Sequence, residues 1–539
     1  MFVGDRNRIN ITSSVFSKFI EENCLYVDKT AFIEHVLQDV SDVLLFTRPR
    51  RMGKSLNMNT LATFLDCTQD TAHMFKGLYI ETSPLFSQVN QHPVVYLDFV
   101  NLDSSNFTGL QQSFRSRILR IISRLFKTKQ LSCDLKEYME NPANYSPHIL
   151  SSLLEAVSET HQKKPYLIVD EYDKIIMDTL NHKESDEIKG FIVNVLQNVL
   201  KGVTYFNKAV LTGVTRTTKE SLFSTLNNLK VYDVLKSGVY DADFSLTESE
   251  LLELVPESEI AGVREWYNNM RVGNEWLYNI YSVMSYLSNP EQGLMGYWSM
   301  TGGGGLLSSL LTDSRVEAIN AMFSDKAYRH ETTLDYQLNM EHLKDVSQCN
   351  DVSFYTLAVQ AGYLSFEPVV ADVYRVFIPN AEAKRVWAKL LLDNQYKGAD
   401  SRLPSIFAGI ADVEVFSGKL TEFVSMVLSY NDFKARAEWV YHVFFLGMVY
   451  SLGYECKSNL EAGLGRFDIM LKSRTFCAVI EFKAAKSSSA AALQKGAEEA
   501  LSQIDGKEYW HELQNSPLPL YKIGIACHGK KCLVKTLLH

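Results

Sequence analysis

The sequence is informative first for what it does not contain. No apolar run reaches about 18 residues, so we expect no transmembrane helix and no membrane partner. The first residues, MFVGDRNRINITSS, lack the long apolar core of a secretory signal. The eight cysteines are scattered, and the histidines have no metal-ligand spacing. These absences predict a soluble protein of a reducing compartment, the cytoplasm.

One pair of cysteines does lie close together, in CHGKKC near the C-terminal end. The short gap between Cys527 and Cys532 is similar to that of a zinc site, but no second pair of ligands lies nearby. Both cysteines lie in strand-like sequence. We therefore interpret them as structural residues.

Length and charge set broad limits on the function. A chain of 539 residues is too long for one ordinary core, so two to four domains are expected. The net charge of −9 argues against broad electrostatic binding of nucleic acid. Residues 431–539, however, carry more basic than acidic side chains. This C-terminal part is the better candidate for contact with a phosphate backbone.

The pattern along the chain predicts three regions. Residues 1–245 alternate short apolar strands with amphipathic stretches, which is typical of a parallel sheet covered by helices. Residues 246–430 have mainly helical periodicity, with a short hairpin within Gly362–Asn380. Residues 431–539 form a separate α/β unit, in which we expect a helix, two paired strands, another helix and a last strand. The expected N-terminal strands are Val43–Thr47, Val94–Phe99, Pro165–Asp170 and Lys208–Gly213.

The stretch LLFTRPRRMGKSL follows the first of these strands with half of a phosphate-binding loop. Gly53, Lys54 and Ser55 supply the turn, the lysine for the β/γ-phosphates and the hydroxyl for Mg²⁺. The first glycine of the usual pattern is missing, because Arg48 occupies its position. Pro49 can stiffen the turn instead, and the arginines add positive charge. A basic surface turn is the alternative interpretation.

Two further strands end in residues that suit nucleotide chemistry. PYLIVDEYD ends in Asp170 and Glu171, which would hold Mg²⁺ through its water shell and polarise the attacking water. KAVLTGVTR ends in Thr212, a candidate γ-phosphate sensor, with Arg216 just beyond to stabilise transition-state charge. Taken alone, these could be a strand ending in solvated acids and an exposed loop arginine.

A second site is readable in GRFDIMLKSRTFCAVIEFKAAK. Phe467–Lys472 and Thr475–Lys483 read as two strands joined by a tight turn. Glu481 and Lys483 then project to one side, and Asp468 can lie opposite them. Two carboxylates and a lysine suit hydrolysis of a phosphodiester assisted by Mg²⁺ or Mn²⁺, with Asp468 and Glu481 as metal ligands. The alternative is a hairpin with ordinary exposed charges.

Several of these motifs carry a resemblance to a known family. LYVDKT, RPRRMGKS, LIVDEYD, LTGVTRTTKESLFSTLNNL and WSMTG are similar to motifs of the AAA-ATPase-like family, whose members commonly carry a C-terminal PD-(D/E)XK nuclease domain. The resemblance implies a P-loop NTPase fold followed by a restriction-endonuclease-like fold. It also implies that the arginine-rich loop is a family variant of the phosphate loop. The implied ATP-binding loop residues are Arg48, Pro49, Arg50, Arg51, Met52, Gly53, Lys54, Ser55 and Leu56.

The resemblance also implies further residues of the nuclease site. Asp468, Glu481 and Lys483 match the D…(D/E)-x-K motif. Glu438 stands where an acidic residue often joins the metal, and Gln503 and Tyr509 resemble residues that position the substrate strand. The sequence departs from the family in WYNNM and YNIYSV, which puts contacts of the middle region in doubt.

Together these observations predict an ATPase that carries a Mg²⁺-dependent deoxyribonuclease, with nucleotide state controlling cleavage. DNA is the expected partner, RNA stays open as a substrate, and a homo-oligomer is left open. The competing hypothesis is a signalling or scaffold ATPase, whose C-terminal domain binds nucleic acid without cutting it.

Overall fold

The computed structural model forms two compact units, which we describe separately. Unit 1 comprises 1–298 and 331–380, and unit 2 comprises 299–330 and 381–539. These units divide the predicted middle region between them, and the three predicted domain boundaries remain a prediction. The residues described are 2–127, 148–201, 204–216, 228–236, 238–272, 275–298, 305–324, 327–335, 337–370, 372–395, 403–429, 449, 452, 454–458, 461–462, 465–466, 469–506, 513, 516–529 and 531–539.

A five-stranded parallel sheet forms the centre of unit 1. Its strands are β3 (Val43–Thr47), β4 (Val94–Asp98), β5 (Tyr166–Asp170), β6 (Lys208–Gly213) and β7 (Leu229–Tyr232). They lie in the order β4-β5-β6-β3-β7, and every pair is parallel. Strands β3, β5 and β6 are fully buried, as expected for a sheet covered on both faces. The predicted strands are confirmed to within one residue at each end.

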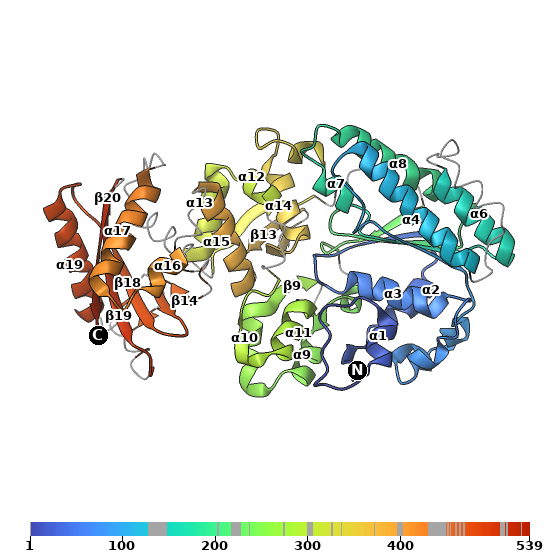
Figure 1. The fold of residues 1–539 in the computed structure, drawn as a ribbon, viewed down its shortest axis with the longest axis horizontal. Coiled ribbons are helices and arrows are strands. Elements are labelled where there is room, and N and C mark those ends of the chain that lie inside the picture. Colours follow the sequence, from blue (N-terminus) through green and yellow to red (C-terminus); the bar gives the residue numbers. More distant parts are fainter. Residues whose placement is uncertain are drawn as a thin grey trace. The chain divides into compact units, whose positions relative to one another are not determined.

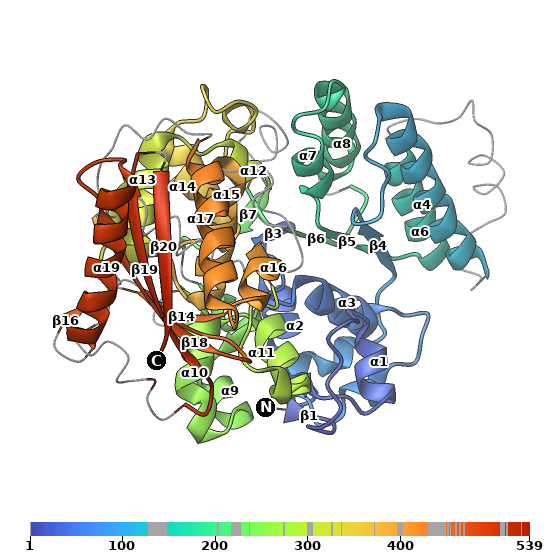
Figure 2. The same cartoon turned by 60° about the vertical axis from the view of Figure 1, so that its left-hand side comes forward.

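Helices cover both faces of this sheet (Figures 1 and 2). On one side lie α1 (Phe16–Glu21), α2 (Ala31–Gln38) and α3 (Lys54–Leu65), and on the other α4 (Phe107–Lys127), α6 (Ile149–His161), α7 (Lys174–Asp178) and α8 (Ser185–Leu200). The first group packs apolar side chains such as Phe32, Val36 and Leu61 against Leu44 and Phe46 of the sheet. This α/β architecture is the one predicted.

The rest of unit 1 includes smaller helices, the two-stranded sheet β1-β2 (Phe2–Val3, Tyr26–Val27) and two three-stranded sheets. The sheet β8-β10-β9 (Leu246–Thr247, Glu275–Tyr278, Asn268–Val272) accompanies α9 (Glu248–Leu254), α10 (Glu257–Tyr267) and α11 (Ile280–Ser288). The sheet β11-β13-β12 (His330–Thr333, Val373–Phe377, Ser365–Val370) accompanies α14 (Asp351–Gln360). The predicted hairpin is β12–β13, whereas β9, β10 and β11 were not indicated by the sequence pattern.

Unit 2 contains a mixed five-stranded sheet in the order β14-β17-β18-β19-β20. Its strands span Glu455–Ser458, Ile469–Lys472, Cys477–Ala484, Leu520–His528 and Lys531–Leu538, and only β18 and β19 run parallel. Helix α17 (Val413–Ser429) packs against β20, and α19 (Ala490–Gly506) against β18 and β19. The unit also holds α12 (Gly305–Ser309), α13 (Asp313–Ser324), α15 (Ala381–Gln395), α16 (Leu403–Ala408) and the short pair β15–β16 (Glu461–Ala462, Gly465–Arg466). Strands β14 and β20 were not predicted.

Candidate functional site

The loop after β3 leads directly into the N-terminus of α3. Gly53 immediately precedes the helix with φ of 80°, a left-handed conformation that a residue without a Cβ adopts readily. The first N–H groups of this 12-residue helix point out of its N-terminal end. Together with the helix dipole, they form a favourable position for an anion such as phosphate.

Lys54 begins the helix and folds back over the loop. Its Nζ donates to the carbonyl oxygens of Arg48 and Pro49 at 3.0 and 2.8 Å. Burial lowers the pKa of Lys54, while Glu171, Asp170 and Asp173 oppose that shift. The lysine therefore lies in the electrostatic field of the acids that follow β5.

Arg48, at the position of the missing glycine, does not point out of the loop. Its side chain is buried, and Nη1 donates to the carbonyl oxygens of Thr47 and Tyr232 at 3.0 and 2.9 Å. The guanidinium also lies 5.2 Å from the ring centre of Phe244. Arg48 thus fixes the loop to β7 and to the segment before β8. The idea of an exposed, purely basic turn does not fit this residue.

The other predicted loop residues have different environments. Met52 and Pro49 are buried, whereas Arg51 is exposed with φ of 65° and lies 4.5 Å from the ring centre of Tyr281. Arg50 lies close enough to influence the pKa values of Lys54 and Glu171. Ser55 and Leu56 are half-buried in the first turn of α3.

Strand β6 lies between β3 and β5, so three strand ends converge beside the loop. Phe46 of β3 pairs with Thr212, and Leu211 pairs with Val169 of β5. Thr212 Oγ1 donates a short hydrogen bond to Asp170 Oδ1, and Tyr96 OH donates to Asp170 Oδ2 at 3.3 Å. The buried Asp170 carboxylate is therefore oriented by two hydroxyl groups.

Glu171 follows in a left-handed conformation with φ of 52°. Its backbone N–H donates to Thr212 Oγ1 at 3.4 Å. Burial raises the pKa of Glu171; Lys54 opposes the rise and Asp170 adds to it. A carboxylate with a raised pKa in a partly desolvated position can accept a proton from water near neutral pH.

Two residues missed in the sequence hold the segment after β6. Asp173, buried, accepts hydrogen bonds from Thr215 N and Thr215 Oγ1, both at 2.7 Å, and burial raises its pKa. Gln360 Oε1 accepts from Arg216 N at 3.4 Å, and Arg216 O accepts from Leu338 N at 2.8 Å. The Asp at the end of LIVDEYD could have been suspected, but Gln360 comes from a distant segment and carried no signal.

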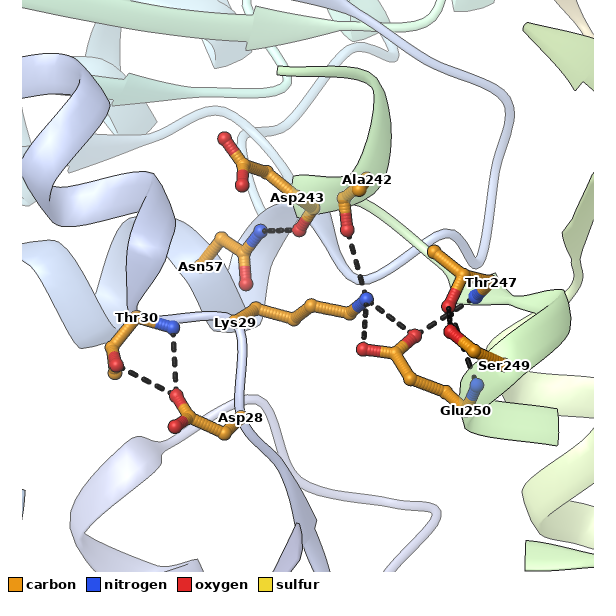
Figure 3. A network of polar contacts seen from close by, with 9 residues as sticks. All are labelled: Asp28, Lys29, Thr30, Asn57, Ala242, Asp243, Thr247, Ser249 and Glu250. Carbon is orange, nitrogen blue, oxygen red and sulfur yellow. Dashed lines mark hydrogen bonds and ion pairs between the residues drawn. The ribbon is translucent and has the colours of Figure 1, made fainter. Parts of the chain in front are cut away.

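Figure 3 shows a network of polar contacts that involves Asn57 of α3, the helix that follows the Lys54 loop. Asn57 of α3 donates from Nδ2 to the Asp243 carbonyl at 2.7 Å. Lys29 Nζ, from the LYVDKT motif, lies 2.6 Å from Glu250 and 2.8 Å from Ala242 O, and Glu250 completes the capping box of α9 with Thr247. The motif thus connects the segment before α2 to the start of α9.

The C-terminal candidate site lies on β18 and α19. Glu481 is buried, and its Oε1 accepts a short hydrogen bond from Gln503 Nε2 and lies 3.5 Å from Lys483 Nζ. The two charged residues therefore share one side of the strand, as the alternation predicted. Gln503 reaches them from α19.

Gly524 of β19 allows α19 to pack this closely. Gly524 pairs with Glu481, and a Cβ on Gly524 would lie 2.3 Å from the carbonyl oxygen of Ala497 in α19. Such a distance is below any real contact, so the helix approaches the sheet only because this side chain is absent.

The remaining predicted residues of this site, Glu438, Asp468 and Tyr509, lie outside the described residues. Within the described ranges, no group of three or more His, Cys, Asp or Glu side chains is arranged to hold a metal ion. One buried carboxylate beside a lysine and an amide fits part of a metal-dependent hydrolytic site. The assignment of its other ligands stays a prediction.

Two further features of the chain concern an arginine of α4 and the possibility of a membrane-spanning helix. Arg117 of α4 forms an ion pair with Asp98 of β4, with 2.8 Å between Nη1 and Oδ2. No helix among the described residues combines the length and apolarity needed to span a bilayer.

Comparison with known proteins agrees with the resemblance. Residues 9–223 match a family described as Predicted AAA-ATPase, and residues 436–537 match the PD-(D/E)XK nuclease superfamily. The chain is also 25% identical over 540 residues to an uncharacterized protein encoded in the vnfD 5′ region of Azotobacter chroococcum mcd 1, with 96% of each chain covered. The chain therefore carries an AAA-ATPase-like domain followed by a nuclease-superfamily domain, and the suspected resemblance is confirmed.

Proposed function

We propose that this AAA-ATPase-like protein hydrolyses ATP in unit 1 and cleaves DNA phosphodiester bonds in unit 2. The observation that carries the ATPase proposal is the convergence of the Lys54 loop, Asp170 and Thr212 at the ends of three neighbouring parallel strands. A helix N-terminus with a lysine suits the β/γ-phosphates, and a buried aspartate oriented by hydroxyl groups suits a hydrated Mg²⁺ ion.

Each side chain has a definite task in this proposal. Lys54 exchanges its two carbonyl acceptors for phosphate oxygens. Ser55 and Asp170 would hold Mg²⁺, which supplies charge neutralisation on the phosphates when bound. Glu171 accepts the proton of the attacking water. Thr212 senses the γ-phosphate from its position beside Asp170, and Arg216 stabilises transition-state charge.

Phosphate release from ATP tests this half of the proposal. Lys54→Ala is expected to lower the rate by about 100-fold or more, because one preorganised donor to a transition-state oxyanion is worth that much. The control is Lys76→Ala, which removes an exposed lysine within residues 9–223, the region that matches the ATPase family. This variant should leave the rate unchanged. Equal rates for Lys54→Ala and wild type would exclude this loop as the site.

In unit 2, Glu481 with Asp468 would hold Mg²⁺ or Mn²⁺, with Glu438 as a further ligand. Such an ion supplies an activated water and charge stabilisation for phosphodiester hydrolysis. Lys483 steadies the developing negative charge, and Gln503 orients the Glu481 carboxylate. The contact set of Glu481, Lys483 and Gln503 supports this half of the proposal.

Incubation of supercoiled plasmid with the protein and Mn²⁺ tests the nuclease. Wild type is expected to nick the DNA, and Glu481→Ala to lose this activity. Glu499→Ala, on the exposed surface of α19, serves as the matched control. Nicking by Glu481→Ala at the wild-type rate would remove the assigned site, and binding without nicking by wild type would favour the scaffold alternative.

We extend the proposal to coupling of the two activities, because both sites occur on one chain. ATP then changes the cleavage rate of the wild-type protein and has no effect on Lys54→Ala. An identical ATP response of the two proteins would refute the coupling and leave two independent activities.

A further inference from the structure

The two cysteines of CHGKKC lie directly opposite each other on a hairpin. Strands β19 and β20 run antiparallel, and Cys527 is the register partner of Cys532. Directly opposite residues of an antiparallel pair have Cα atoms about 4.5–5.5 Å apart. A disulfide accepts Cα separations of about 4.4–6.8 Å, so the spacing expected for this register pair falls within the range for a bridge.

Both thiols project from the same face of the sheet and are buried there. Side chains alternate along β19, and Ala526 packs with Ala497 of α19 on one face. Cys527 therefore lies on the other face, with Cys532 and Thr536; there Ser417 of α17 donates to Thr536 Oγ1 at 2.9 Å. Cys527 and Cys532 are 1% and 5% exposed.

The surroundings favour oxidation over metal binding. His528, the neighbouring potential ligand, points to the opposite face by the same alternation, and its Nδ1 lies 2.7 Å from the Ala485 carbonyl oxygen. Among the residues that the structure describes, no third ligand joins the two thiols, so they do not complete a zinc site. Two thiols held face to face can, however, form a bond to each other.

We propose that Cys527 and Cys532 form a reversible disulfide when the protein meets a peroxide. Cys532, the more exposed thiol, attacks the peroxide oxygen, the O–O bond breaks, and a sulfenic acid and water form. Cys527 then attacks this sulfur, the S–O bond breaks, and a second water leaves. Two thiols are oxidised to one disulfide while one hydrogen peroxide is reduced to two waters. The inference is independent of the proposed ATPase and nuclease.

Burial disfavours the thiolate form of Cys527 that the second step uses. It raises the pKa of the Cys527 thiol well above its usual value. Because only the thiolate attacks, the disulfide forms faster as the pH rises.

The sequence supplies a direct assay. Trypsin cuts after Lys522, Lys530, Lys531 and Lys535, which places the two cysteines in the separate peptides 523–530 and 532–535. The reduced full-length protein is treated with hydrogen peroxide, alkylated under denaturing conditions, and digested without reductant. A linked peptide lighter by two hydrogen atoms than the sum of the free peptides is expected as their main form, and dithiothreitol should release both.

Controls separate proximity from general oxidation. Cys477, buried on β18, faces no cysteine in either register and should be recovered alkylated and unlinked. In Cys532→Ser, the peptide 523–530 should also remain unlinked. Recovery of both wild-type peptides only as alkylated, sulfinic or sulfonic forms, or linked mainly to other cysteines, would overturn the proposal.

Discussion

The two candidate sites differ in how their side chains are brought together. In unit 1, Lys54 follows β3 at the start of α3, Asp170 ends β5 and Thr212 lies on β6, and the strand order places β6 between β3 and β5. In unit 2, Glu481 and Lys483 come from one strand, and Gln503 reaches them from a helix. The first arrangement is fixed by sheet register, whereas the second depends on how closely α19 packs. Sites fixed by register should tolerate loss of a neighbouring packing contact better.

Exchange of each proposed catalytic carboxylate, Glu171 and Glu481, for its amide tests whether the two candidate sites are chemically separate. Glu171→Gln should retain nucleotide binding but lose about 100-fold or more of ATP hydrolysis, because a general base is removed. Glu481→Gln should leave ATP hydrolysis within about twofold, since this carboxylate serves only the proposed phosphodiester hydrolysis. Phosphate release and nucleotide titration of both variants measure this. A large loss of ATP hydrolysis in Glu481→Gln would break the comparison.

Two arginines of one loop provide a stability test in unit 1. Arg48→Met removes two hydrogen bonds and a buried positive charge. The carboxylates that favour this charge, those of Asp233, Asp241 and Asp243, would lose their cation, so the variant should lose about 3 kcal/mol of unfolding free energy. Arg51→Met removes an exposed arginine stacked on Tyr281 and should cost less than about 1 kcal/mol. Urea unfolding followed by fluorescence compares them, and equal costs would contradict the buried role of Arg48.

Gln503 tests the dependence of the second site on α19. Gln503→Leu keeps the side-chain size but removes the amide that donates to Glu481, and plasmid nicking should fall about tenfold. Gln494→Leu, on the exposed surface of the same helix, is the control. Nicking unaffected by Gln503→Leu, with circular dichroism unchanged, would show that Glu481 does not need this donor.

The smallest expected effect is the acidic limit of ATP hydrolysis. In the proposed mechanism Glu171 acts as a carboxylate base, and its raised pKa means that it becomes protonated at a higher pH than an ordinary glutamate, whose pKa is 4.5. Activity should therefore fall, as the pH is lowered, at a midpoint above 4.5. The profile of kcat/KM against pH measures this for the free enzyme. Full activity at and below that pH, in folded protein, would argue against Glu171 as the base.

Much of unit 1 could be predicted because its strands are short apolar runs that end in the functional residues. The order of the strands could not, since parallel pairing joins segments far apart in the sequence. The burial of the Arg48 side chain could not be predicted either, because a loop with several arginines is usually expected to be exposed to solvent. Its acceptor at Tyr232 becomes a neighbour only when β7 pairs with β3.

In unit 2, the alternation of Glu481 and Lys483 was predictable from the strand period alone. Strand β20 was not predicted as a separate strand, although Cys532 lies in strand-like sequence, because only the short turn at Gly529 separates it from β19. The resemblance implied that Gln503 positions the substrate strand, and its hydrogen bond to Glu481 was not predicted. Its distance depends on Gly524, whose packing role no sequence pattern indicated.

Gly524 has a consequence for how unit 2 can change over time. Any mutation there that adds even a methyl group would lift α19 from the sheet and withdraw the amide from Glu481, although the acid, the lysine and the glutamine all stayed in the gene. A sequence comparison restricted to the candidate-site residues would not detect the loss in such a variant. The proposed hydrolysis would be lost through a position outside the candidate site itself.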